Sequence, residues 1–228
     1  MSKGLFIVFE GNNGAGKTTI INELIEKLKI CSNVIIDIKN NRNIYNWNVY
    51  KFPNRSTTLG KKIDDFLKNK IQFSSKEVEL KFFSDNRKEF QKEMVYILNK
   101  GYNIICDRYI YSSMAYTLTD QSVNILDNKI NQILTIDDIL YYDRNFIIPD
   151  YVFLIKGNYL HLRNENEELY HKNKIFNSIL FNNYIISIQK TKVKFVIIDN
   201  KFGDLNNTVN FIIHIINKII NDRINKIY

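Results

Sequence analysis

Short apolar runs alternate along this chain with longer segments whose apolar residues recur at helical spacing. Such an alternation predicts an α/β domain built on a mostly parallel sheet. The runs that predict strands are residues 5–9, 48–52, 103–107, 151–155 and 195–198. Because ligands bind outside the carboxyl ends of the strands in such sheets, the residues that follow these runs are the first candidates for a functional site.

Helical periodicity follows most of these runs. Apolar residues at helical spacing predict helices over 19–29, 59–69, 75–100, a segment after Ser112, 166–190 and 205–225. Gly101 is placed to end the third of these helices as the residue just beyond it. The segment 33–48 contains the run VIIDIK and the polar stretch NNRN, and it is either an extra element or an alternative to the second strand.

Length and composition favour one globular domain over residues 1–228, since 45% hydrophobic content is enough for a sizeable core. Cys31 and Cys106 have no paired spacing near histidines, which favours a reducing compartment without a disulfide framework or a zinc site. The apolar run near the N-terminus is too short for a signal peptide, and no run approaches the roughly 18 apolar residues that span a bilayer. We therefore expect a soluble, cytoplasmic protein without a membrane partner.

The chain carries a formal net charge of +8. A positive balance suits nucleic acids, membrane surfaces or small polyanions such as nucleotides. The lysines and arginines are scattered rather than gathered in one block, so a bias in residue usage explains the charge as well as function does. Charge alone therefore does not select a partner.

Residues 11–18 read GNNGAGKT and directly follow the first predicted strand. This is a full match to G-x-x-x-x-G-K-[ST], the phosphate-binding loop, whose backbone N–H groups form a concavity at a helix N-terminus. We expect Lys17 to reach the β- and γ-phosphates of a bound nucleoside triphosphate and the Thr18 hydroxyl to bind Mg²⁺. The chemistry indicated is phosphoryl transfer or hydrolysis of a nucleoside triphosphate. The predicted ATP-binding residues are Gly11, Asn12, Asn13, Gly14, Ala15, Gly16, Lys17, Thr18 and Thr19.

Three further segments carry residues suited to a second, phosphorylated substrate. In FPNRSTTLGKKI the proline fixes a turn that presents Arg55, whose guanidinium can bind a phosphate. Phe83 and Arg87 share one predicted helix face, where a ring can stack on a base and a guanidinium can hydrogen-bond its edge. Asp107 ends the third predicted strand in a position suited to Mg²⁺, and Arg108 follows it as a second anion-binding group. In a parallel sheet these segments converge on one crevice.

Six segments resemble the thymidylate kinases, in particular the eukaryotic and viral branch of these P-loop nucleoside monophosphate kinases. In family order they are IVFEGNNGAGKTT, FPNRSTTLGKKIDDFL, FFSDNRKEF, CDRYIYSSMAY, IPDYVFLI and RNENEELY. The phosphate loop alone is generic, whereas F-P-x-R-x-T-x-x-G, F-S-x-N-R and D-R-Y-x-x-S-x-x-A-Y together are highly specific. The resemblance implies a P-loop NTPase fold with a mobile lid at about 157–175 and an insertion at about 33–48.

The resemblance also implies a role for each matching residue. Arg55 and Arg108 would bind the monophosphate of dTMP, and Asp107 would organise Mg²⁺ and its waters. Phe83 would stack on thymine, and Arg87 would donate a hydrogen bond to its O4. The implied catalytic set is Lys17, Asp107, Arg108 and the lid residue Arg163, and the implied metal ligands are Thr18 and Asp107. The implied dTMP-binding residues are Asn13, Phe52, Arg55, Phe83, Arg87, Arg108, Ser112, Tyr116 and Tyr170.

Two positions of the phosphate loop depart from the family pattern. Asn13 stands where an aspartate that touches the sugar 3′-OH is usual, and its amide can hydrogen-bond there without a charge. Gly14 stands where many eukaryotic members carry a basic residue. We therefore expect neutralisation of the transition state to depend more on Arg163 of the lid.

The sequence thus predicts a thymidylate kinase that converts ATP and dTMP into ADP and dTDP with Mg²⁺. A kinase of broadened specificity, which accepts dUMP, dGMP or related monophosphates, is an alternative, since the pocket residues alone do not settle base selectivity. A P-loop ATPase that binds nucleic acid is a weaker alternative, because the aromatic residues and arginines cluster in nucleotide-sized motifs. The family is usually dimeric, so we expect a homodimer whose partners are small nucleotides rather than nucleic acid.

Overall fold

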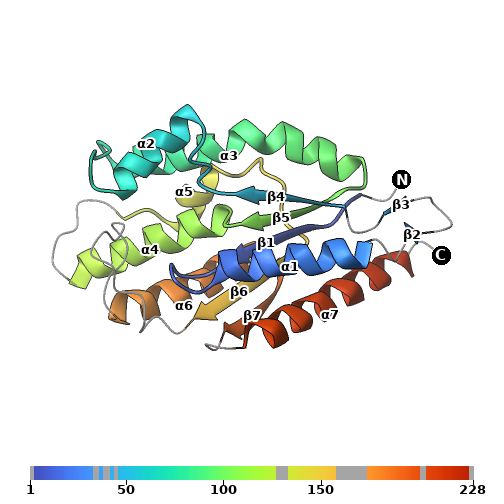
Figure 1. Cartoon of the computed structure of the whole chain (residues 1–228). Coiled ribbons are helices and arrows are strands. Elements are labelled where there is room, and N and C mark those ends of the chain that lie inside the picture. The colour runs from blue at the N-terminus through green and yellow to red at the C-terminus, as the bar shows by residue number, and fades with distance from the viewer. Residues whose placement is uncertain are drawn as a thin grey trace.

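The computed structural model describes residues 3–32, 36–37, 42–43, 46–126, 133–157, 174–200 and 204–225. In chain order its elements are β1 (Phe6–Glu10), α1 (Lys17–Ser32), β2 (Ile36–Asp37), β3 (Arg42–Asn43), β4 (Trp47–Lys51), α2 (Thr58–Leu67), α3 (Lys76–Asn99), β5 (Asn103–Asp107), α4 (Ile110–Leu126), α5 (Ile136–Tyr141), β6 (Tyr151–Gly157), α6 (Lys174–Lys190), β7 (Lys194–Asn200) and α7 (Leu205–Ile224) (Figure 1). A 5-stranded parallel sheet has the order β4-β5-β1-β6-β7. The predicted α/β fold with a parallel central sheet is confirmed.

The first strand lies at the centre of the sheet, and its neighbours end beside it. Phe9 of β1 is in register with Asp107 of β5, and Asp107 is in register with Lys51 of β4. The loop after β1, the turn after β4 and Arg108 after β5 therefore leave the sheet at one edge. This is the carboxyl edge, where ligands bind in open α/β sheets.

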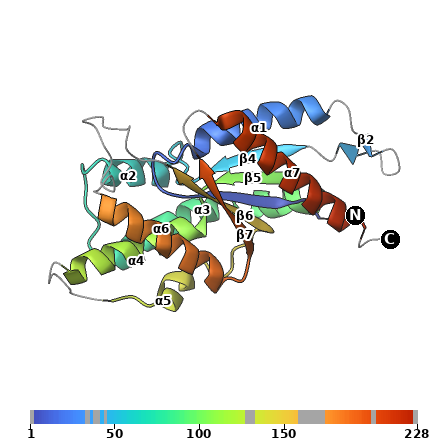
Figure 2. The same cartoon turned by 90° about the horizontal axis from the view of Figure 1, so that it is seen from below.

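Helices cover both faces of the sheet, so the central strand is buried on each side. Figure 2 shows α1 and α7 on one face and α3, α4 and α6 on the other. Along β1, Ile7 and Phe9 belong to the core cluster under α1 and α7, whereas Phe6 and Val8 belong to the cluster on the opposite face. Because successive side chains of a strand point to opposite faces, a strand covered on both faces is apolar throughout, as β1 is up to Glu10.

The helix predicted after Ser112 in fact begins earlier, at Ile110. The residues Ile110, Tyr111, Met114 and Ala115 are buried at helical spacing, so apolar packing starts the helix ahead of the polar residues. As a result, Ser112 lies in the first turn of α4, within hydrogen-bonding distance of the end of β1.

The short helix α5 lies where no element was predicted. Its 6 residues begin with a capping box, in which the Thr135 side chain accepts from the Asp138 backbone N–H and the Asp138 carboxylate accepts from the Thr135 backbone N–H. Ile139 is its buried residue. A helix this short shows too few turns for apolar periodicity, so the cap was the signal that could have indicated it.

Some expectations fall partly outside the described residues. The segment 33–48 includes the antiparallel pair of β2 and β3, and residues 33–35, 38–41 and 44–45 lie outside the description. The described part of α6 begins at Lys174, so residues 158–173 of the expected lid lie outside it as well. Gly101 follows α3 with a φ of 85°, which confirms its expected place beyond the helix end. Within the described ranges, no helix is long and apolar enough to cross a membrane.

Candidate active site

The predicted phosphate loop connects β1 to α1 in a conformation that requires glycine. Gly11, Gly14 and Gly16 have φ values of 136°, 74° and 83°, which residues with a Cβ rarely adopt. At Gly11 a Cβ would also lie 2.2 Å from the carbonyl oxygen of Ile155 on β6. The glycines therefore allow the loop to curl tightly against the sheet above the N-terminus of α1.

Lys17 is buried inside this loop. Its Nζ donates to the carbonyl oxygens of Gly11 at 2.8 Å and Asn12 at 2.7 Å. Burial and the nearby positive charge of Arg108 hold the pKa of Lys17 well below its usual value, against the opposing effect of the Asp107 carboxylate. An anion that enters the loop would favour the protonated form, so the site is built to attract negative charge.

Thr18 and Asp107 meet at the mouth of the loop. The Thr18 hydroxyl donates to Oδ2 of Asp107 at 2.8 Å, and Lys51 lies 3.5 Å from the same carboxylate oxygen. The other oxygen, Oδ1, is buried and has no hydrogen-bond partner among the described residues. A hydroxyl beside a carboxylate with an unpaired oxygen is a donor set that suits a hard divalent cation.

Arg108 is held from several sides. It has a positive φ of 69°, and its backbone N–H donates to the carbonyl oxygen of Phe9 at 2.9 Å. Its Nη1 donates to Ser112 Oγ at 3.2 Å and to the Tyr184 hydroxyl at 2.8 Å, while Nη2 donates to Asn13 Oδ1. Side chains of the loop, α4 and α6 thus hold the guanidinium in place.

Glu10, which was not predicted from the sequence, supports this network from below. Its carboxylate accepts from the Tyr109 backbone N–H at 2.8 Å and from Ser112 Oγ at 2.7 Å. Burial raises the pKa of Glu10 to about 7, although Arg108 opposes the shift. The available signal was a carboxylate at the end of an otherwise apolar strand.

The acceptor-side residues come from α3 and from the turn after β4. Arg55 Nη1 forms an ion pair with Asp64 Oδ1 at 2.7 Å. The Phe83 ring packs edge-on against Phe66 with 6.5 Å between ring centroids. Arg87 is buried, and its Nη2 donates to both carboxylate oxygens of Asp143 at 3.0 and 2.7 Å. Phe83 and Arg87 both line the cavity described next, as residues on one face of α3 can, and an aspartate distant in sequence fixes the arginine.

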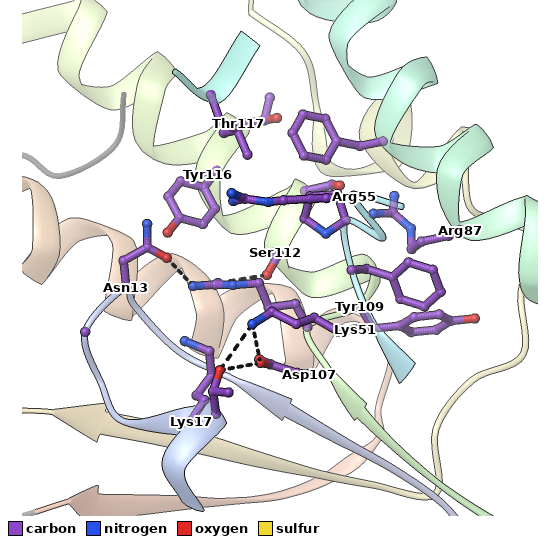
Figure 3. Close-up of a pocket in the computed structure, with 18 of the residues that line it drawn as sticks. Asn13, Lys17, Lys51, Arg55, Arg87, Asp107, Tyr109, Ser112, Tyr116 and Thr117 are labelled. Atoms are coloured by element: carbon purple, nitrogen blue, oxygen red, sulfur yellow. Dashed lines mark hydrogen bonds and ion pairs between the residues drawn. The ribbon is translucent and has the colours of Figure 1, made fainter. Parts of the chain in front are cut away.

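One cavity of about 590 Å³ joins the loop to these residues, as Figure 3 shows for its labelled side chains. The predicted residues that line it are Asn13, Gly14, Gly16, Lys17, Thr18, Thr19, Phe52, Arg55, Phe83, Arg87, Asp107, Arg108, Ser112 and Tyr116. Gly11, Asn12 and Ala15 are buried in the loop, and Asn12 Nδ2 donates to the carbonyl oxygen of Asn177 on α6 at 2.9 Å. Arg163 and Tyr170 lie outside the described residues.

Sequence reasoning did not predict Glu10, Lys51, Asp143 and Tyr184, which all contact predicted residues of the site. Glu10 and Lys51 each end a strand at the carboxyl edge, which was a usable signal. Asp143 and Tyr184 act through partners 56 and 76 residues away, so no local pattern indicates them.

A phosphate loop that faces a second group of guanidinium side chains across one cavity suits transfer of a phosphoryl group between two nucleotides. The fold and site therefore define a P-loop kinase. A model of the family described as "Thymidylate kinase" matches residues 9–212. The chain belongs to the thymidylate kinase family and is a phosphotransferase.

Individual relatives agree with this assignment. A curated protein named thymidylate kinase from Plasmodium falciparum (isolate 3D7) is 36% identical over 173 residues, which cover 75% of this chain and 71% of the relative. The solved thymidylate kinase of Candida albicans, described as having broad substrate specificity, aligns with a TM-score of 0.75 and 26% identity over 97% of this chain and 94% of that one. That of Ehrlichia chaffeensis, at 23% identity and a TM-score of 0.66 over 94% and 99% of the chains, shows the shared fold.

Proposed function

We propose that this protein transfers the γ-phosphoryl group of ATP to dTMP, forming ADP and dTDP. The observation that supports this most is that Lys17 of the phosphate loop, Arg55 and Phe83 line the same cavity. Two nucleotides bound there would meet at their phosphate groups: the triphosphate of the donor would point toward the monophosphate of the acceptor. Membership of the thymidylate kinase family supports dTMP as the acceptor.

The reaction requires alignment and charge neutralisation more than covalent chemistry from the protein. An oxygen of the dTMP phosphate attacks the γ-phosphorus and forms a new P–O bond. The bond between the γ-phosphorus and the β,γ-bridging oxygen breaks, and ADP leaves with the electron pair of the broken bond. The two anions repel each other, and we assign Lys17, Arg55 and Arg108 to neutralise them. Because Arg108 is already held by Ser112, Tyr184 and Asn13, little reorganisation would be needed at the moment of transfer.

Thr18 and Asp107 are the residues that would hold Mg²⁺. Their 2.8 Å contact, and the buried Asp107 oxygen that has no hydrogen-bond partner in the described part of the chain, fit an ion that uses one or two protein ligands and takes the rest from phosphates and water. When bound, Mg²⁺ neutralises charge that develops on the β- and γ-phosphate oxygens.

The nucleoside of dTMP would lie between α3 and α4. We assign the Phe83 ring to stack on thymine and the Arg87 guanidinium to donate to its O4. Tyr116, whose ring centroid lies 5.9 Å from the Arg108 guanidinium, would disfavour a ribose 2′-OH, and Asn13 would contact the 3′-OH. Phe52 and Ser112 complete the wall on this side.

Arg163 and Tyr170 belong to the proposed lid, outside the described residues. The lid would close over both phosphate groups before transfer, because an open site would let water accept the phosphoryl group. The single-domain organisation, the homodimer and the cytoplasmic location stay predictions. Sedimentation of the purified protein tests the dimer directly.

The function is tested by phosphoryl transfer from ATP to a panel of monophosphates: dTMP, dUMP, dGMP, AMP, CMP and GMP. We expect dTMP to have the highest kcat/KM and the reaction to need a divalent cation. Comparable rates with dUMP or dGMP would instead indicate a kinase of broadened specificity. Transfer to dTMP no faster than to AMP would contradict the proposal, as would ATP hydrolysis that depends on DNA rather than on a monophosphate.

A further inference from the structure

Lys51 places a positive charge on the residues assigned to the metal. It is the last residue of β4, and its Nζ lies 3.3 Å from Thr18 Oγ1 and 3.5 Å from Asp107 Oδ2 (Figure 3). Neither the phosphate-loop motif nor the acceptor motifs include this lysine. At these distances the Lys51 ammonium offsets the negative charge of Asp107, which is the carboxylate assigned to the divalent cation.

The contact between Lys51 and Asp107 is suited to being temporary. The Lys51 side chain is 60% exposed, whereas that of Asp107 is 5% exposed, so the lysine approaches a buried carboxylate from the solvent side. The contact holds the lysine only weakly, because its ammonium stays largely in water and a long flexible side chain must be ordered to make it. A divalent cation bound to Thr18 and Asp107 would repel the ammonium at this distance.

The same cavity would hold the acceptor phosphate, with which the displaced ammonium of Lys51 could pair. Lys51 lines it together with Arg55 and Arg108, the two residues assigned to the acceptor phosphate. The strand end fixes the backbone of Lys51, and its side chain of four flexible methylene groups lets the ammonium change position within the cavity.

We propose that Lys51 is an exchangeable cation of this site: it pairs with Asp107 until the metal–nucleotide complex binds, and then turns to the acceptor monophosphate. This inference rests on the proposed function. Its consequence is a positive coupling, in which the donor complex strengthens binding of dTMP and dTMP strengthens binding of the donor complex by the same factor.

The test measures the Kd of dTMP by calorimetry, alone and with saturating Mg²⁺ and the β,γ-imido analogue of ATP. In the unaltered protein we expect the analogue complex to tighten dTMP binding at least about fivefold. In Lys51→Met, which keeps the length but loses the charge, dTMP alone should bind nearly as before, and the tightening should fall below about twofold. Lys51→Arg should retain it. Lys81→Met removes an exposed lysine paired with Asp85 outside the cavity and should leave both Kd values unchanged.

A second readout follows the metal itself. Titration of Mn²⁺ in the presence of the analogue, followed by electron paramagnetic resonance, should show at least about threefold tighter binding to Lys51→Met, because no ammonium has to be displaced. Equal loss of dTMP affinity with and without the donor complex would make Lys51 a permanent phosphate ligand and overturn the inference. Full coupling in Lys51→Met would overturn it as well. If the unaltered protein bound dTMP but showed no coupling, only this inference would fail, whereas absence of any dTMP binding would contradict the proposed function.

Discussion

Arg87 and Asp143 form an ion pair that is almost completely removed from solvent, with 3% and 2% of their side chains exposed. One nitrogen, Nη2, contacts both carboxylate oxygens, and Nε is buried without a hydrogen-bond partner among the described residues. The pair joins α3 to the segment that follows α5. A buried arginine needs such a partner, since an unpaired charge there would cost several kcal/mol. Asp143 is therefore a positioning residue that fixes Arg87 at the wall of the cavity.

Asp143→Asn should raise the KM for dTMP about tenfold and change kcat less than about threefold, because the base contact is weakened while the phosphates are held as before. Selectivity should also fall: dCMP carries an amino group where dTMP has O4, and a misplaced Arg87 would discriminate between them less. Steady-state kinetics with both nucleotides measure these effects. The control is Asp85→Asn, which changes an aspartate of α3 that pairs with the exposed Lys81. A lower melting temperature with unchanged KM would restrict Asp143 to a structural role.

Phe83→Ala should weaken dTMP binding by about 1–3 kcal/mol if the ring stacks on the base. Phe82 is the matched control, because it is the neighbouring residue on α3, packs against Phe73 with 4.6 Å between ring centroids and does not line the cavity. Calorimetry with dTMP and thermal melting of both variants separate binding from folding. If Phe83→Ala bound dTMP normally but melted much lower, its ring would belong to the core alone.

Lys17→Ala should lower kcat about 10³-fold or more with the fold intact, because the ammonium neutralises charge on the phosphoryl group in transit. The two hydrogen bonds that its ammonium makes among the described residues go to neutral carbonyl groups, so its removal leaves no directly bonded carboxylate without a partner there. Lys29→Ala, near the end of the same helix and exposed, should keep full activity. Single-turnover rates with saturating ATP and dTMP give the comparison. A loss below about tenfold would contradict the assigned role.

The central strands β1, β5 and β6 were predictable because burial on both faces of the sheet leaves little choice of residues. The run 103–107 is β5 as observed, whereas the run 48–52 is displaced by one residue from β4 at Trp47–Lys51. Phe52 resembles a strand residue because its backbone N–H still donates to Asp107 O at 2.9 Å beyond the strand end. Helix α5 was missed because its stability depends on a cap and one buried isoleucine rather than on a periodic face.

The residues of the site also fall into a group that could be predicted from the sequence and a group that could not. Lys17, Thr18 and Arg108 were predictable because their chemistry is carried by contiguous motifs at strand ends, which a parallel sheet brings together. Asp143 and Tyr184 were not, because each matters only through a partner distant in sequence. A carboxylate on an irregular segment and a tyrosine within a long helix have no local signature. Only the packing of α4 and α6 brings Tyr184 to Arg108.

Glu10 should make the stability of the protein fall as pH rises toward neutrality. Its pKa is about 7 in the fold and near 4.5 in an unfolded chain. Between these values the folded protein binds a proton that the unfolded chain has released, so the free energy of unfolding decreases with increasing pH and levels off above about 7. The difference of about 2.5 units bounds this loss at roughly 3 kcal/mol.

Glu10→Gln, which cannot ionise, isolates the effect. Between pH 5 and 8, the difference in stability between the unaltered protein and this variant should favour the unaltered protein most near pH 5. By pH 8 this difference should have fallen by several °C in Tm, or by about 2 kcal/mol in the free energy of urea unfolding. Glu26→Gln on the surface of α1 should give a small difference that does not change with pH. If the difference for Glu10→Gln were also constant from pH 5 to 8, Glu10 would be ionised throughout, held by Arg108 against the cost of burial.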